Sequence, residues 1–334
     1  MARAAGRSTP VERLSTVLTT IGLADLARIA TGRRSVVILN YHHVERKAFA
    51  RHLDFLQERY EIRNLGEVVS PGLRGGFPVR PGLALTMDDG YRDNYDQALP
   101  ELKARGLSAT IFLVTSYVGT GRRLWWDRLD EALVQPQVAE LQVAGKPLPL
   151  SDPAEVGRAR TRVAALAQGL PHAEAMALLD DVFAQLRAPE AGGLERSAIL
   201  DWSQVEEMSR NGIGFGSHTL THPILSRLDE AAARNELEAS RNELIDRLGT
   251  PPSLLAYPHG QAGDIGEVIP VLARQAGYRG AVTTIGGRFR PTDNAFMIPR
   301  ISVNPDESMD VLALKAGGVW PWIARTKAAL ARAG

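Results

Sequence analysis

Short apolar runs alternate with longer stretches of mixed residues along most of this chain of 334 residues. The short runs are typical of buried strands, and the apolar residues at helical spacing between them are typical of amphipathic helices. Strands are predicted at residues 35–40, 82–86, 109–114, 212–217, 253–257, 280–284 and 296–303. Helices are predicted at residues 48–59, 94–105, 229–248 and 265–276. Alternation of this kind favours parallel βα units in an α/β fold.

The pattern changes in three regions. Residues 127–198 are rich in Ala, Leu, Glu and Arg and are predicted as a mostly helical insertion, with a hairpin at residues 143–150. Residues 1–34 are predicted as an N-terminal helical extension and residues 311–334 as a C-terminal helix. The α/β unit then spans residues 35–310, a length that a single domain can use.

Composition is that of an ordinary globular enzyme, with 44% hydrophobic and 23% charged residues. The 39 basic residues exceed the 38 acidic ones by one, so the charge gives no reason to expect a nucleic-acid partner. Cysteine is absent, which excludes disulfides, thiol catalysis and a thiolate zinc site. The sequence also contains no phosphate-binding loop, dinucleotide fingerprint or serine nucleophile elbow.

The two ends of the chain bear on its location. Arg3, Arg7 and Arg13 are followed by no sufficiently apolar core, so we expect an amphipathic helix instead of a signal peptide, and a cytoplasmic protein. No run approaches the roughly 20 apolar residues of a membrane span. Residues 311–332 mix apolar and basic side chains. Packing of this segment against the α/β unit is the preferred interpretation, and peripheral contact with a membrane surface is the alternative.

Chemically active residues follow two of the predicted strands. Asp88 and Asp89 end one apolar run, and His218 and His222 end another. One carboxylate and two histidines form a three-ligand set for a divalent ion, and the second carboxylate is then left to act as a base. Taken alone, Asp-Asp-Gly is typical of a turn, and two histidines four residues apart are often surface residues. Together, at the ends of parallel strands, they favour a hydrolase that activates water on a metal.

These motifs resemble those of polysaccharide deacetylases, carbohydrate esterase family four, which includes chitooligosaccharide deacetylases. The motifs that carry the resemblance are Thr-Met-Asp-Asp-Gly at 86–90, Ser-His-Thr-Leu-Thr-His-Pro at 217–223, Leu-Asp-Trp-Ser at 200–203, Ala-Tyr-Pro-His-Gly at 256–260, Tyr-His-His-Val at 41–44 and Ile-Pro-Arg-Ile at 298–301. The last two are similar to flanking signatures of the branch found near surface-polysaccharide genes. The resemblance covers about residues 35–305, with an unmatched insertion inside that range.

The resemblance implies a distorted (β/α)7 barrel, a divalent metal, and removal of N-acetyl groups from an amino sugar. It implies that Asp88 is the general base and that Asp89, His218 and His222 bind the metal. Zinc is the expected ion, and cobalt, nickel or iron suit the same ligands. The resemblance also implies that the backbone N–H of Tyr257 contributes to an oxyanion hole.

Two groups of the family pattern are missing from their usual places. Residues 254–256 are Leu-Leu-Ala where members carry an Arg that orients the base, and no histidine follows His259 to serve as the acid. Protonation of the leaving amine is still required, because an amide nitrogen departs poorly as an anion. We therefore expect His42, or as second choice His259, to donate this proton, and Arg300 to pair with Asp88. A histidine bonded to backbone and an Arg that closes the barrel by a salt bridge are the structural alternatives.

Trp125 and Trp126 are candidates for stacking on a sugar ring, with packing in the core as the alternative. The sequence thus favours a metal-dependent carbohydrate N-deacetylase that acts on an oligo- or polysaccharide or its precursor. Two alternatives stay open at this point. One is a metal amidohydrolase of the same fold that acts on a small cyclic amide or ureide, and the other is a non-catalytic carbohydrate-binding protein with a degenerate site. Retention of both Asp88 and Asp89 argues against the second, because a structural site needs no spare base.

Overall fold

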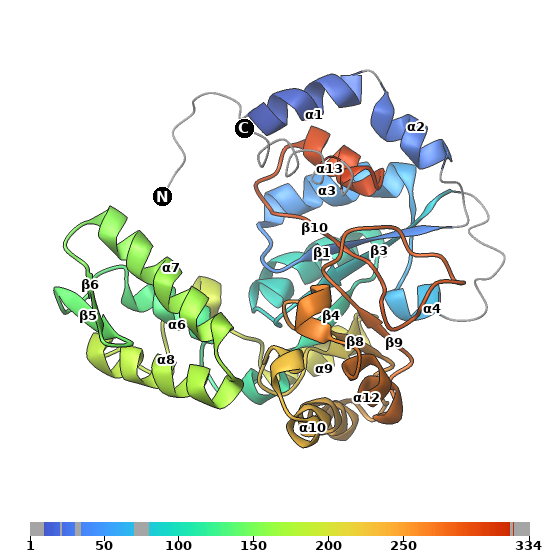
Figure 1. Cartoon of the computed structure of the whole chain (residues 1–334). Helices are drawn as coiled ribbons and strands as arrows, with labels where there is room; N and C mark the ends of the chain where they lie inside the picture. Colours follow the sequence, from blue (N-terminus) through green and yellow to red (C-terminus); the bar gives the residue numbers. More distant parts are fainter. Residues whose placement is uncertain (1–9, 21, 31–34, 70–79, 321–322, 324–334) are drawn as a thin grey trace.

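The centre of the molecule is a curled sheet in which all neighbouring strands are parallel (Figure 1). The computed structural model describes residues 10–20, 22–30, 35–69, 80–320 and 323. In spatial order the strands are β10 (Ile301–Ser302), β1 (Val36–Tyr41), β3 (Gly82–Met87), β4 (Thr110–Leu113), β7 (Gly214–Ser217), β8 (Leu254–Ala256) and β9 (Gly280–Val282), with β2 (Glu61–Ile62) beside β3. The predicted α/β fold is confirmed, and every residue of β1, β3, β4, β8 and β9 is buried, as parallel strands covered on both faces require.

One segment brings the two edges of the sheet together. Ile298 forms a parallel bridge with Val282 of β9, and three residues later Ile301 of β10 pairs with Leu39 of β1. The result is the distorted barrel that the resemblance implies. The strand predicted at 296–303 is correct in place and too long, because only Ile301–Ser302 forms a ladder with β1.

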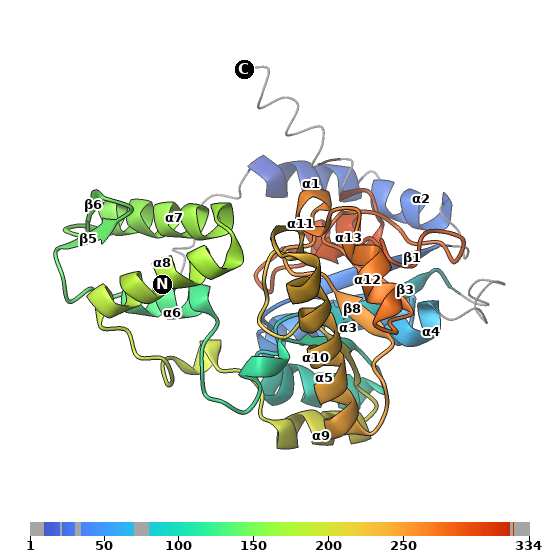
Figure 2. The same ribbon diagram turned by 60° about the horizontal axis from the view of Figure 1, so that its bottom comes forward.

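Helices cover the outside of the barrel (Figures 1 and 2). They are α3 (Arg46–Arg59), α4 (Leu65–Val69), α5 (Leu99–Arg105), α9 (Trp202–Arg210), α10 (Glu230–Leu248), α11 (Ala262–Ile265), α12 (Ile269–Gln275) and α13 (Met309–Ala316). Single 3-10 turns are η4 (Thr115–Tyr117), η5 (Glu195–Ser197) and η6 (Leu225–Arg227).

Two predicted helices differ from the structure. The helix predicted at 265–276 begins later, as α12 at Ile269, because Gly266 takes a φ of 68°, which ends the preceding helix α11. The helix predicted at 94–105 begins as a π-helical turn, η3 (Asn94–Ala98), and continues as α5. Pro100 lacks the N–H that would extend an α-helical ladder through this turn.

The region predicted as a mostly helical insertion forms helices and one hairpin and has a hydrophobic core of its own. It consists of α6 (Trp125–Ala132), the hairpin β5 (Glu140–Val143) and β6 (Lys146–Pro149), α7 (Pro153–Gly169) and α8 (His172–Leu186). Its core residues, among them Leu129, Val163 and Leu179, form a cluster separate from those of the barrel. In Figures 1 and 2 the insertion (green) stands at one side of the barrel.

The N-terminal extension forms two helices, α1 (Pro10–Thr20) and α2 (Leu23–Ala30), where one was expected. Ala24 of α2 packs with Ala313 and Leu314 of α13, so the start of the predicted C-terminal helix packs against the rest of the molecule. That helix ends at Ala316, and most of the predicted range beyond Trp320 lies outside the described residues.

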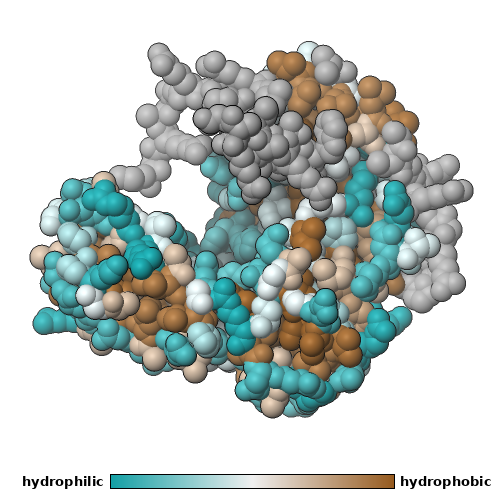
Figure 3. All heavy atoms as spheres, in the orientation of Figure 1, coloured by the Kyte–Doolittle hydropathy of each residue, from teal (hydrophilic) through white to brown (hydrophobic). Residues whose placement is uncertain are grey.

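The outer face of α1 and α2 exposes three apolar side chains. Val17, Leu26 and Ile29 are 57%, 63% and 65% exposed, and brown spheres mark this region at the top of Figure 3. Among the described helices, none has the length and apolar character needed to cross a membrane. Peripheral membrane contact stays a prediction.

Candidate metal centre and active-site cleft

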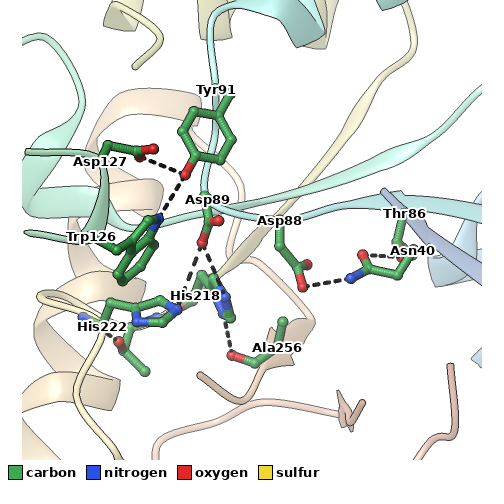
Figure 4. A network of polar contacts seen from close by, with 12 residues as sticks. Asn40, Thr86, Asp88, Asp89, Tyr91, Trp126, Asp127, His218, His222 and Ala256 are labelled. Atoms are coloured by element: carbon green, nitrogen blue, oxygen red, sulfur yellow. Dashed lines mark hydrogen bonds and ion pairs between the residues drawn. The ribbon is translucent and has the colours of Figure 1, made fainter. Parts of the chain in front are cut away.

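The site lies at the carboxyl ends of the barrel strands, where loops of parallel sheets gather. Asp88 and Asp89 directly follow β3, His218 directly follows β7, and Tyr257 directly follows β8. These loops converge in Figure 4, although the residues are far apart in sequence. The two motifs singled out in the sequence therefore meet at one edge of the sheet.

Three buried side-chain atoms, one oxygen and two nitrogens, face one another at the centre of the site. The Nε2 atoms of His218 and His222 lie 3.5 Å and 3.7 Å from the same atom, Asp89 Oδ1. Among the described residues, Asp89 Oδ1 has no hydrogen-bond partner. The carboxylate and both rings are at least nine-tenths buried, and the grouping has the form of a metal-ligand set.

The tautomer of His218 supports metal binding. Its Nδ1 lies 2.8 Å from the carbonyl oxygen of Ala256 and must donate there, which leaves Nε2 as a bare acceptor towards Asp89. Two acceptors at such a distance repel each other unless a cation stands between them. Two ligands bound tetrahedrally at about 2.0–2.1 Å lie roughly 3.4 Å apart, close to the separations observed here. The residues present therefore fit a divalent ion.

Electrostatics of the three side chains agree with this fit. Burial, together with the charge of Asp88, raises the pKa of Asp89 well above its usual range. Burial lowers the pKa of His218 to about 4, against the opposing charge of Asp88, and burial with the neighbouring histidines lowers that of His222. A buried neutral histidine is the form that binds a metal, and a cation would offset the cost of ionising Asp89.

The backbone of the site is strained. Asp89, Thr219, His222 and His259 have φ angles of 72°, 68°, 65° and 59°. Residues with a Cβ atom rarely adopt this region, at a cost of about 1–2 kcal/mol each. Backbone strain of this kind persists where surrounding contacts hold the chain in place, and it is common where a side chain must point in one direction for function. Here the left-handed turn at Asp89 sends its side chain away from that of Asp88, towards the histidines (Figure 4).

Glu236 of α10 holds the histidine loop and was not anticipated from the sequence. Its carboxylate accepts hydrogen bonds from the backbone N–H groups of Leu220 and Thr221 at 2.9 Å and from the Thr221 hydroxyl at 2.6 Å. The side chain is buried, and its three bonds lie between the two metal-ligand histidines in sequence. It is a positioning residue, because it touches the loop and not the ligands.

Asp88 has a separate set of partners. Arg300 donates from Nη1 and Nη2 to the two carboxylate oxygens, each at 2.7 Å, and Asn40 donates at 3.0 Å. Arg300 also donates to the Asn40 side chain at 2.8 Å and to the Thr283 carbonyl at 3.0 Å. The pairing expected from the sequence is thus present, and the contribution of Asn40 was not anticipated. Burial alone would raise the pKa of Asp88, but the Arg300 guanidinium holds it well below its usual range.

A third network ties the Asp-Asp loop to the insertion. The Tyr91 hydroxyl donates to Asp127 at 2.7 Å and accepts from the indole N–H of Trp126 at 3.0 Å (Figure 4). The Trp126 ring stands edge-on against His222, with centroids 4.8 Å apart. Trp126 therefore packs beside a candidate metal ligand, and its partners Tyr91 and Asp127 were not anticipated from the sequence.

The remaining predicted residues line a cavity of about 460 Å³ above the centre, together with Asp88 and Asp89. They are His42, Trp125, Trp126, Tyr257 and His259. His42 is exposed to solvent where it borders this cavity. Partial removal of its ring from water by the surrounding protein lowers its pKa, and the charge of Asp88 opposes that shift. Burial likewise lowers the pKa of His259.

The backbone N–H of Tyr257 is not directed at the cavity. It donates to the Val282 carbonyl at 3.1 Å, as part of the pairing of β8 with β9, and the phenol donates to the Phe296 carbonyl at 3.1 Å. In this structure the N–H therefore serves the sheet, and the oxyanion role expected of it would require that bond to open.

The model of the polysaccharide deacetylase family matches residues 78–281, more than half of the chain. The chain belongs to the polysaccharide deacetylase family. A curated Bacillus subtilis protein named as a polysaccharide deacetylase, YxkH, is 21% identical over 280 residues, which cover 81% of this chain and 72% of that protein. The carbohydrate-active hydrolase expected from the motifs is thereby confirmed at the level of the family.

Solved structures show the same fold. Deacetylase PplD of Streptococcus pyogenes, in complex with acetate, matches with a TM-score of 0.56 and 19% identity, over 84% of this chain and 97% of that one. IcaB of Ammonifex degensii matches with a TM-score of 0.54 and 19% identity, over 85% of this chain and 97% of the other. At such identities the likeness concerns the distorted barrel alone.

Variants of His218 and Asp88 should distinguish the residues that bind the metal from the residue that acts as the base. We expect His218→Ala to lose affinity for zinc by more than the roughly 10–100-fold that loss of an outer hydrogen-bond partner costs. Asp88→Asn should keep near-normal zinc affinity, because Asp88 is bonded to Arg300 and Asn40 and lies outside the three-atom cluster. Calorimetric titration of zinc into the metal-free variants measures both. Full metal occupancy in a His218→Ala, His222→Ala double variant would contradict the assignment.

His218 should lower the stability of the metal-free protein as pH falls below neutrality, while Asp89, whose pKa burial raises, acts in the opposite direction. The pKa of His218 is lowered from 6.5 to about 4 by burial, so the unfolded chain takes up a proton first. Its contribution to the free energy of unfolding is complete above pH 6.5 and is lost progressively down to about pH 4, and it amounts to roughly 3 kcal/mol. Denaturant unfolding from pH 4 to 7.5 measures this slope. A His218→Gln variant should show a smaller slope, and an unchanged slope would disprove the assignment to this residue.

Proposed function

We propose that this protein is a metal-dependent N-deacetylase of an amino sugar in an oligo- or polysaccharide or its precursor. The observation that carries the proposal is the division of labour between adjacent carboxylates. Asp89 Oδ1, which has no hydrogen-bond partner among the described residues, faces two histidine nitrogens, while Asp88 is held apart by Arg300 and Asn40. A structural metal site needs only Asp89 and the two histidines, whereas metal-dependent hydrolysis also needs a base such as Asp88.

Asp89, His218 and His222 would hold the ion. When bound there, a divalent ion of the zinc type supplies Lewis acidity to an amide carbonyl and makes a nearby water more acidic. Its ligands leave the cavity side of the centre open, since Asp88, His42 and the tryptophans line the space above. An acetamido group on a sugar fits a cavity of this size and polarity.

Asp88 accepts the proton of the attacking water. Both of its oxygens are fixed by Arg300, and the second also by Asn40, so the carboxylate cannot rotate away from the cavity. The Arg300 charge holds its pKa well below the usual range, so the group is ionised before reaction at any physiological pH. A weak base of this kind works only on a water that is already acidified, which agrees with metal dependence.

His42 donates the proton that the leaving amine requires, with His259 as second choice. His42 lies at the end of β1, feels the charges of Asp88 and Arg300, and presents an exposed side chain to the cavity. Burial lowers its pKa, so the ring must first take up a proton during the reaction, and once protonated it is a stronger acid towards the amine. His259 also lines the cavity, and its ring centroid lies 5.3 Å from that of His222.

Support for the substrate class comes from the relatives. The structure of PplD is a complex with acetate, which is the product that N-deacetylation would release. The flanking signatures at residues 41–44 and 298–301 point to enzymes of surface-polysaccharide synthesis. The cytoplasmic location is part of the proposal, and it would make a sugar carried on a nucleotide or lipid, or an oligosaccharide under assembly, the natural substrate.

Acetate release from N-acetylglucosamine oligomers tests the proposal. We expect the zinc-loaded full chain to release acetate, metal chelation to abolish release, and Asp88→Asn to abolish it with zinc still bound. The same preparations are offered small cyclic amides and ureides. Turnover of those and not of the sugars would favour the amidohydrolase alternative, and sugar binding without turnover of either would favour a binding protein.

Replacing His42 should affect the chemical step and not the metal. Loss of a general acid costs about 10²–10⁴-fold in rate, so His42→Ala should lower kcat by that order with unchanged zinc content. One limb of the pH–rate profile should flatten at the same time. His259→Ala is the matched control and should leave that limb in place. Near-normal turnover and pH dependence in His42→Ala would transfer the role to His259.

A further inference from the structure

One face of insertion helix α7 lines the active-site cavity. Arg160, Ala164 and Gln168 are spaced by four residues and therefore lie in a row along the helix, and all three border the cavity that holds Asp88 and Asp89. The neighbouring row, Ala159, Val163 and Ala167, is buried in the core of the insertion. Packing of this second row fixes which side of α7 turns to the barrel.

The row is held in position on both sides. The Arg160 guanidinium forms a two-point ion pair with Asp130 of α6, with Nη2 2.8 Å from Oδ2. The same helix α6 begins with Trp125 and Trp126, and the Trp126 indole donates to Tyr91 of the barrel. Arg160 is therefore held at the cavity that contains Asp88 and Asp89 by contacts that run through α6 to Tyr91 of the Asp-Asp loop. Figures 1 and 2 show α6 and α7 side by side in the insertion.

The chemistry of this wall suits neutral hydroxyl groups. On the cavity wall Arg160 supplies N–H donors, and the Gln168 amide supplies both a donor and an acceptor. Sugar hydroxyls donate and accept, and the apolar faces of sugar rings suit Trp125, which also borders the cavity. Because Asp130 already balances the Arg160 charge, the wall offers little net attraction to a phosphate or carboxylate.

We propose that Arg160 and Gln168 form a subsite for a second, neutral sugar residue, next to the N-acetylated unit at the metal centre. The inference rests on the proposed function for the identity of that first unit. It makes the preferred substrate at least a disaccharide and gives the insertion the task of selecting chain length. Neither residue contacts the metal-ligand set, so both are positioning residues for substrate.

Binding of N-acetylglucosamine and of its disaccharide to the zinc-loaded full chain tests this inference, measured by calorimetry together with kcat and KM for acetate release. Arg160→Ala and Gln168→Ala should each weaken binding of the disaccharide by about 3–10-fold, the effect of one hydrogen bond, and leave binding of the monosaccharide unchanged. KM should rise while kcat stays constant, because the contact is equal in ground and transition states. Arg162→Ala is the matched control, since Arg162 is an exposed arginine of the same helix that does not border the cavity.

A second variant separates this role from loss of the ion pair. Arg160→Ala leaves Asp130 without its partner, so the Arg160→Ala, Asp130→Ala double variant, which removes the whole pair, should show the same loss for the disaccharide. Equal effects on both sugars, or none, would overturn the inference, as would gain or loss confined to phosphate-bearing sugars. If wild type binds the disaccharide through these residues but releases no acetate, the subsite stands and the proposed function fails.

Discussion

The buried ion pair between Asp88 and Arg300 is the interaction on which the barrel and its chemistry both depend. Either charge alone would be costly to bury, and two parallel hydrogen bonds of 2.7 Å offset that cost. Arg300 lies on the segment that joins β9 to β1, while Asp88 ends β3. The pair therefore forms only when the barrel closes, and closure in turn fixes the base.

The same pair resolves the conflict between two adjacent carboxylates. Asp88 takes the positive partner, which leaves Asp89 buried with its Oδ1 opposite two histidine nitrogens. Because Asp89 has a φ of 72°, its side chain points towards the two histidines, while the side chain of Asp88 points towards Arg300. One carboxylate is stabilised by the fold, whereas the other is buried without a cationic partner among the described residues, at a cost in stability that a bound cation would offset.

Sequence reasoning found the parts of the site that lie at strand ends. Asp88, Asp89, His218 and His222 are adjacent to apolar runs, and parallel topology brings such ends together. Asn40 and Glu236 escaped notice, because one is the polar end of a buried strand and the other one glutamate among many on α10. Gly266 lies inside the helix predicted at 265–276. Its positive φ, which ends α11, depends on the surrounding fold and cannot be predicted from the local sequence. Chain-distant hydrogen bonds leave no local pattern to read.

Tyr91 shows how the insertion and the centre act on each other. It follows Asp89 by two residues, and its hydroxyl is bound at once by Trp126 and Asp127 of α6. Movement of α6 would therefore shift the loop that carries Asp89, and the Trp126 ring would lose its contact with His222. The insertion and the centre are therefore joined both through the Tyr91 phenol and through the Trp126 ring. Substitutions within the insertion core can then alter the centre without touching it, whereas exposed positions on the far side of α7 and α8 are free of that constraint.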